Sequence, residues 1–114
     1  MATVTATKVS EDPMVLGRLS EFYEATMTTG DTFTPIMINS RAFQLTAQLV
    51  PVVSGTGKVQ WSSKLSTPAA TDWIDWVPGS VSAATGVIIP TAKWINLVCT
   101  VGTVKLNIWS QGGI

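Results

Sequence analysis

Apolar and polar residues alternate along much of the chain, which is the period of two that a strand with one buried face produces. The pattern is clearest in residues 42–53, where every second residue from Phe43 to Leu49 is apolar and those between are polar. Residues 58–65 repeat it, with Val59 and Trp61 on the apolar face. No segment of ten or more residues shows the 3.6-residue period of an amphipathic helix, so we expect strands and no long helix.

The first third of the chain predicts shorter extended segments. Residues 2–9 alternate threonine with small apolar residues, which suits an edge strand or an extended arm. In residues 14–20 the apolar positions follow neither the period of two of a strand nor the 3.6-residue period of a helix. Residues 22–27 and 32–38 are expected to form a hairpin around the turn-forming residues 29–31.

The last 20 residues predict two strands. Residues 93–101 and 103–109 each place a row of aliphatic residues on one face. Gly102 between them suits the first central position of a type II′ hairpin turn, which requires a positive φ. A second turn is expected at residues 54–57, where two glycines follow a serine.

Further extended segments at residues 73–77 and 80–89 bring the total to seven or eight short strands separated by turn residues. That number and spacing predict an all-β fold, an antiparallel β-sandwich of jelly-roll-like architecture. The chain has 114 residues, which suits one core. We therefore expect residues 1–13 to form an extended N-terminal arm or edge strand, and residues 14–114 a single β-sandwich domain.

Charged residues are scarce. They make up 12% of the chain, about half the roughly 25% of a soluble domain, and the net charge is zero. A chain with so few charges often hides surface in an assembly, so we expect a homo-oligomer or a larger assembly; a surface kept wet by hydroxyl and amide groups is the alternative. The bases form no cluster, so no nucleic-acid partner is expected.

The acidic residues gather near the N-terminus. Residues 1–31 hold five acids against two bases, a balance of −3. We interpret these acids, Glu21 and Glu24 among them, as solvated charges rather than calcium ligands, since no loop has the oxygen density of a calcium site. The N-terminus lacks the cationic start and apolar stretch of a signal peptide, and no apolar run approaches the ~20 residues that span a bilayer. We expect synthesis in the cytosol and no membrane partner.

The residue types needed for catalysis and metal binding are almost absent. The chain has no histidine and one cysteine, Cys99, which lies in an aliphatic row and reads as a packed core thiol. Asp72 and Asp75 are three residues apart on an extended segment, so their side chains are expected on opposite faces. We therefore expect no enzyme activity, with no catalytic, cofactor-binding or metal-binding residues.

Five tryptophans are the remaining feature. Trp61 fits the core, whereas Trp94 and Trp109 lie opposite the aliphatic rows of their strands and Trp73 and Trp76 bracket Asp75. Aromatic residues are enriched at interface cores, which makes four of them interface candidates: Trp73, Trp76, Trp94 and Trp109. Ordinary intrachain packing and stacking on a sugar ring are the alternatives.

Four short motifs stand out in the second half of the chain: GTGKVQW at residues 55–61, DWIDW at 72–76, PTAKWINL at 90–97 and TVGTVKLNI at 100–108. Together they resemble motifs of small structural proteins of tailed bacteriophages. The chain is most similar to a capsid decoration, or cement, protein. This resemblance implies a virion location after synthesis in the host cytoplasm, a dimer or trimer, and the major capsid protein as partner. A carbohydrate- or receptor-binding module using Trp73 and Trp76, and a tail or baseplate structural protein, are the alternatives.

Overall fold

The chain is almost entirely β-strand in the computed structural model, which describes residues 2–14, 18–38, 41–64, 66–76, 79–89 and 92–113. Within these ranges the strands are β1 (Thr3–Thr5), β2 (Thr7–Met14), β3 (Arg18–Thr28), β4 (Thr32–Thr34), β5 (Ile36–Met37), β6 (Arg41–Ser62), β7 (Ile74–Asp75), β8 (Thr85–Ile89) and β9 (Trp94–Gly113). The helical content of the same ranges is the 3₁₀ turn η1 (Ala70–Asp72), and no helix there has the length and apolar character to cross a membrane. The predicted all-β class is confirmed.

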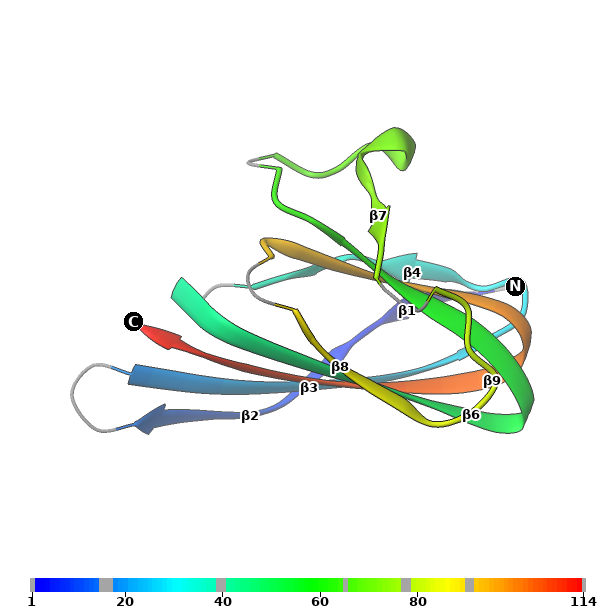
Figure 1. The fold of residues 1–114 in the computed structure, drawn as a ribbon, viewed down its shortest axis with the longest axis horizontal. Helices are drawn as coiled ribbons and strands as arrows, with labels where there is room; N and C mark the ends of the chain where they lie inside the picture. Colours follow the sequence, from blue (N-terminus) through cyan, green and yellow to red (C-terminus); the bar gives the residue numbers. More distant parts are fainter. Residues whose placement is uncertain are drawn as a thin grey trace.

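Two layers of strands pack face to face, and the long strands β6 and β9 contribute to both (Figure 1). One layer has the order β2-β3-β9-β6-β8 and uses the N-terminal half of β6 and the C-terminal half of β9. In the other layer, the remaining halves pair with β5 and β7, next to a two-stranded β1-β4 ladder. All pairings except β1 with β4 are antiparallel, so the fold is an antiparallel β-sandwich.

The predicted hairpin at Gly102 is wrong, because β9 runs through that position without reversing. Thr103 pairs with Val52 and Val101 pairs with Thr56, so three residues of β6 lie opposite the single residue Gly102. This bulge bends both strands, and the bend carries them from one layer to the other. Gly102 does adopt a positive φ of 62°, but it uses that conformation for the bend.

The turn predicted at residues 54–57 is also wrong, because these residues lie inside β6 on the other side of the same corner. Ser54 has a positive φ of 53°. A Cβ on Gly55 would overlap the backbone carbonyl oxygen of Thr103. Ser54 and Gly55 do bend the chain, which is why the sequence predicts a turn there. They bend β6 together with its partner β9, however, and do not reverse the direction of the chain.

The N-terminal segment belongs to the sandwich. β1 pairs in parallel with β4, and β2 pairs with β3 along its whole length, with a bulge between Lys8 and Ser10. Residues 29–31 do turn the chain, but the strands on either side enter different sheets, so the predicted hairpin of residues 22–38 does not form. The hairpin does not form because β3 pairs with β9 and not with the strand that follows it in the chain.

The core lies between the two layers and is built from the predicted alternating rows. Strand β6 contributes Leu45, Ala47 and Leu49, each fully buried. Strand β9 contributes to both layers, with buried residues Ile95, Leu97, Cys99, Val104, Leu106 and Ile108. The alternation of apolar residues therefore predicted these buried rows correctly, although the turn predicted between the two rows of β9 does not form.

One acidic side chain lies in this core, against the expectation of a solvated charge. Glu21 is fully buried because it follows the same inward face of β3 as Tyr23 and Ala25. Its carboxylate lies 3.0 Å from the Lys8 ammonium and accepts a 2.7 Å hydrogen bond from the Tyr23 hydroxyl. The buried charge is paired and hydrogen-bonded, which is the condition under which a core tolerates one.

Candidate interaction surface

The outer face of the β2-β3-β9-β6 layer carries an exposed pair of aromatic rings. Alternation along β3 directs Phe22 outward between the buried Glu21 and Tyr23, and alternation along β9 does the same for Trp109. The two residues are register partners, and their rings stack with centroids 5.7 Å apart and planes 7° apart. Phe22 stays 36% exposed and Trp109 37% exposed, so the stacked rings form a surface rather than a core contact.

The rings form one side of an open groove of about 440 Å³. Val9, which is exposed in the bulge of β2, extends the apolar part. The polar part consists of outward side chains from the next rows of the same sheet: Glu24, Thr46, Gln48 and Asn107. An apolar centre bordered by amide and hydroxyl groups is the composition of a protein-contact surface.

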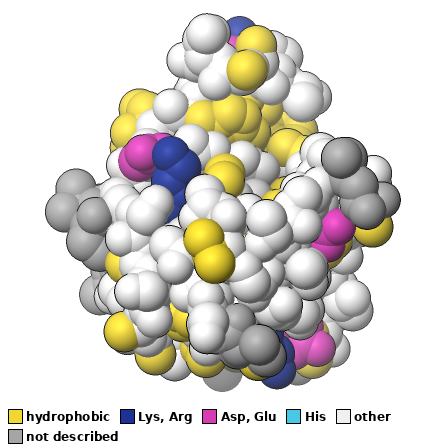
Figure 2. Space-filling model, turned by 90° about the vertical axis from the view of Figure 1, so that its right-hand side faces the viewer, with side chains coloured by type: hydrophobic (Ala, Val, Ile, Leu, Met, Phe, Trp, Pro, Cys, Tyr) yellow, Lys and Arg dark blue, Asp and Glu magenta, His cyan; other side chains and the backbone are white. Residues whose placement is uncertain are grey.

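Charge is sparse on this face and on the rest of the surface. Figure 2 shows the end of the molecule where β6 and β9 bend; the charged side chains there are few, and several acidic ones lie next to a basic one. Two charged side chains on this face lie near each other, Glu24 on β3 and Lys105 on β9. Glu24 pairs with Asn107, and Lys105 is two residues from Asn107 on the same strand. Among the described residues, neither Glu24 nor Lys105 has an ion-pair partner, whereas Lys8, Lys58 and Lys64 each do.

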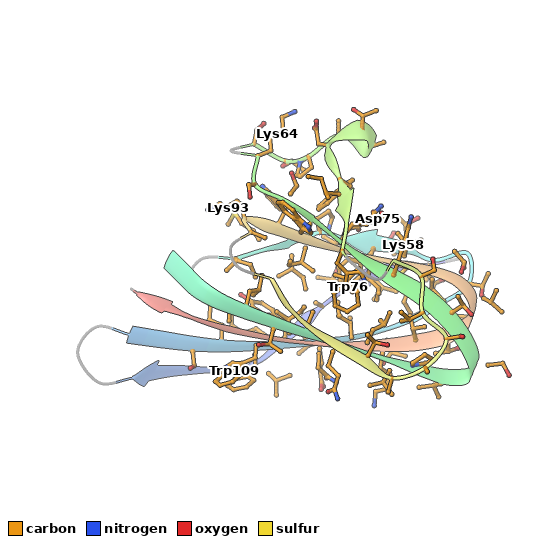
Figure 3. The ribbon with its side chains drawn as sticks, viewed as in Figure 1. Lys58, Lys64, Asp75, Trp76, Lys93 and Trp109 are labelled. Atoms are coloured by element: carbon orange, nitrogen blue, oxygen red, sulfur yellow. The ribbon has the colours of Figure 1, made fainter. Side chains whose placement is uncertain are left out.

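The four tryptophans named as interface candidates occupy different environments. Trp109 points away from the sandwich on its outer face, whereas Trp76 points between the layers (Figure 3). Trp76 is 3% exposed and donates its indole N–H to the Gly79 carbonyl at 3.1 Å, so it is a core residue and not a surface candidate. Trp94 is half-buried and donates to the Lys64 carbonyl at 3.1 Å, and Trp73 is half-buried just after η1.

Phe22 and Val9 are the surface residues that sequence reasoning missed. The alternation of β3 does assign Phe22 to the face opposite Tyr23, so its outward direction could have been read from the sequence. Its contact with Trp109 could not, because the two residues meet through the β3-β9 register, which links distant parts of the chain. Val9 is exposed by a bulge that leaves no clear sequence signal.

Asp72 and Asp75 form separate ion pairs, although Asp72 lies in the 3₁₀ turn η1 and not on the extended segment that was expected. Asp75 accepts hydrogen bonds from Gln60 at 2.8 Å and Lys58 at 3.1 Å, and these contacts lower the pKa of its carboxyl group. Asp72 accepts from Lys64 at 2.7 Å, and chiefly for that reason its pKa is also lowered. The Asp75 pair links β7 to β6, and the Asp72 pair links η1 to Lys64, which follows the end of β6.

The described part of the chain brings no three potential metal ligands together. Cys99 is buried, as expected from its aliphatic row, and its sulfur lies 3.3 Å from the Gly102 carbonyl and 3.4 Å from that of Val101. The arrangement on the outer sheet face can therefore bind by apolar burial and hydrogen bonding.

No protein family and no curated protein matches the chain by sequence. A solved structure of Bacillus endospore appendages, described as a family of disulfide-linked pili, is similar over 95% of this chain and 94% of that one, with a TM-score of 0.50 and 11% identity. This likeness shows the fold. The enzymatically active domain of bacteriophage CBA120 tailspike protein 4 aligns with 98% of this chain and 16% of that one, at 13% identity and a TM-score of 0.24, which is too low to relate the folds.

Proposed function

We propose that this chain is a non-enzymatic structural protein that joins a larger protein assembly through the aromatic groove, and that the assembly is a virion. In this proposal it is a capsid decoration protein that attaches to the shell of the major capsid protein and stabilises it. The observation that carries the proposal is the stacked and exposed pair Phe22 and Trp109 on the outer sheet face. The phage-like motifs in residues 55–108 support the virion setting.

The energy of attachment would come from burial of apolar surface. Fully burying an aromatic side chain that is otherwise exposed is worth about 1.5–3 kcal/mol, and tryptophan is among the residues that dominate binding energy at interfaces. The amides of Gln48 and Asn107 and the hydroxyl of Thr46 would add hydrogen bonds at the edge of the contact. With so few charges on the face, we expect attachment to change little with salt concentration.

A pilus subunit is the second candidate, and the fold likeness to the Bacillus appendage favours it. Those pili are described as disulfide-linked. The single cysteine of this chain is buried against two backbone carbonyls, so a disulfide through it would first require β9 to open beside its bend. A tail or baseplate location would use the same surface with a different partner.

A sugar-binding role through Trp73 and Trp76 loses its platform, because Trp76 packs inside the core. The two rings therefore do not form a flat pair on the surface. Glycan-array binding by the folded protein that disappears in Trp73→Ala would restore this alternative.

Cosedimentation with empty shells of the coat protein encoded in the same genome tests the proposal. We expect the wild-type chain to sediment with the shells at low and high salt, and the Trp109→Ala variant to remain in the supernatant. Ile74→Ala is the matched control, because Ile74 is 51% exposed on β7, away from the groove. A folded wild-type chain that fails to bind the shells, or a Trp109→Ala variant that binds as well as Ile74→Ala, would contradict the proposal.

A further inference from the structure

Among the side chains that the structure describes, the outer sheet face carries one acid and one base beside the groove. Glu24 on β3 and Lys105 on β9 occupy adjacent rows of adjacent strands, because Glu24 pairs with Asn107 and Thr26 pairs with Lys105. Both also line a neighbouring hollow of about 300 Å³, together with Thr7 and Thr26. Within the described residues neither forms an ion pair in its own chain.

We propose that a second copy of this chain covers the groove, forming a two-fold symmetric dimer in which Glu24 of each copy pairs with Lys105 of the other. The inference rests on the proposed function in that the groove is taken as a protein-contact surface. It adds the occupant of the groove in the free protein, whose place a coat subunit would take on the shell, and the charges that select that occupant. In a two-fold contact the same patch is used by both copies, so every contact occurs twice.

The register of the sheet fits such a contact. A two-fold axis that runs along the strands between β3 and β9 exchanges the positions of these strands in the facing copy. Phe22 of one copy then faces Trp109 of the second copy, because the two residues are register partners. Lys105 of the second copy comes over Thr26, one outward position from Glu24 on the same strand, which is within reach of a lysine side chain.

The chemistry of the other side chains on this face also allows it to pair with itself. Thr46, Gln48 and Asn107 carry hydroxyl or amide groups, and each can both donate and accept hydrogen bonds. A face of one charge sign would repel its own copy, whereas a face with one acid and one base attracts it. The observed mixture therefore favours a second copy over a strongly charged partner.

The area of the face is close to what a stable interface needs. Strand β3 has 11 residues, which corresponds to about 35 Å at ~3.3 Å per residue. Five strands spaced ~4.8 Å apart span about 20 Å. The product is about 700 Å² per copy, near the ~800 Å² that each partner contributes to a standard interface.

Sedimentation equilibrium of the full chain, without any shell, tests the dimer. We expect the wild-type chain to dimerise reversibly, and Trp109→Ala to shift it toward monomer. Glu24→Lys and Lys105→Glu should each weaken the dimer by roughly tenfold or more, since each replaces two attractions with two repulsions. The double variant Glu24→Lys/Lys105→Glu should recover most of the lost affinity, because the charges are exchanged and not removed.

The control is Ile74→Ala, which should dimerise like the wild type, and circular dichroism establishes that every variant is folded. A wild-type chain that stays monomeric at high concentration would overturn the inference, as would a double variant no better than the single ones. If the monomer still binds shells through Trp109, the proposed function stands and the groove holds a coat subunit. If the dimer forms but binds no shell, the inference stands and the virion role fails.

Discussion

The Lys8 ammonium and the Glu21 carboxylate lie 3.0 Å apart and join the edge strand β2 to the inner face of β3. The Glu21 side chain is fully buried, and that of Lys8 is one-third exposed. The Lys8 ammonium also lies 5.6 Å from the centre of the Tyr23 ring. The N-terminal strand is therefore fastened to the domain by a charge pair whose acidic half has no access to solvent.

Replacing Lys8 with methionine should destabilise the fold. The variant keeps most of the apolar stem but removes the Lys8 ammonium from beside the buried Glu21 carboxylate, and breaking a buried pair in this way costs about 3–5 kcal/mol. Because Lys8 is partly exposed and solvent screens it, we expect about 1–3 kcal/mol, measured by urea unfolding.

Lys58→Met is the matched control for Lys8→Met. It breaks the 3.1 Å pair with Asp75, whose two side chains are both partly exposed, and should cost less than about 1 kcal/mol. Equal losses in the two variants would show that the burial of Glu21 does not set the stability of the pair.

Tyr23 should ionise well above the usual range. Burial, followed by its hydrogen bond to Glu21, raises the pKa of Tyr23 from 10.0 to about 12. A group whose pKa is raised by folding stabilises the protein fully below the unfolded pKa and loses that contribution as the pH rises through the folded value. Thermal stability should therefore begin to fall above about pH 10, and less so in Tyr23→Phe.

The tyrosinate absorbance measures this ionisation directly, because Tyr23 is the only tyrosine in the chain. We expect its midpoint near 12 in the folded protein and near 10 in denaturant. A folded-state midpoint near 10 would mean that Tyr23 is neither buried nor bonded to Glu21 in solution. In Glu21→Gln the midpoint should move down but stay above 10, because the negative charge of Glu21 is gone while burial remains.

The sequence predicts the class of fold and most of its core, but not its long strands. The inward rows that include Leu45 and Leu106 follow directly from alternation, since a buried face needs an apolar residue at every second position. Gly102 misled the prediction because a positive φ serves a hairpin turn and a bent strand equally well. The choice depends on the partner strand, which local sequence does not contain.

Only part of the candidate surface could be predicted from the sequence, again because the sequence does not show which strands pair. Trp109 was identified from its position opposite the aliphatic row, and it does lie on the outer face. Trp76 was placed on the surface because it neighbours charged and turn residues, but the short strand β7 directs it under β6, and its N–H binds the Gly79 carbonyl. Glu21 was taken as solvated because its partner Lys8 belongs to another strand.

The corner of β6 and β9 should depend on Gly55. An alanine there would place its Cβ on the Thr103 carbonyl oxygen, which is backbone and cannot rotate away. We expect Gly55→Ala to cost about 2 kcal/mol or more, as overpacked sites do. Gly86→Ala in β8 is the control, because its Cβ would meet the Ala47 carbonyl at an ordinary 3.8 Å. Similar denaturation midpoints for the two variants would show that the corner is not tightly packed.

Asp31 should hold the start of β1 in place. Its carboxylate accepts hydrogen bonds from the backbone N–H of Ala2 at 2.9 Å and of Thr28 at 3.1 Å, which lower its pKa. A lowered pKa means that the contribution to stability is present above the unfolded value of 3.8 and is lost as the pH falls below it.

Hydrogen exchange tests this role of Asp31. We expect the protection factors of the Thr3–Thr5 amides, which correct for the intrinsic exchange rate at each pH, to fall in Asp31→Ala at neutral pH and in the wild type under acid conditions. Amides in the centre of β9 should be unaffected in the variant. Unchanged protection of β1 in Asp31→Ala would show that its pairing with β4 alone fixes the strand.

Cys99 should report whether assembly requires a disulfide. Its side chain is buried beside the bend of β9, so we expect a thiol reagent to label the folded chain far more slowly than the denatured chain. Because the dimer and the shell contact are proposed for the outer face of the other end of β9, both should form equally in reducing and oxidising buffer. Cys99→Ala should assemble like the wild type, apart from a modest loss of stability. Assembly that disappears with a reductant, or in Cys99→Ala while the chain remains folded, would instead favour a disulfide-linked filament.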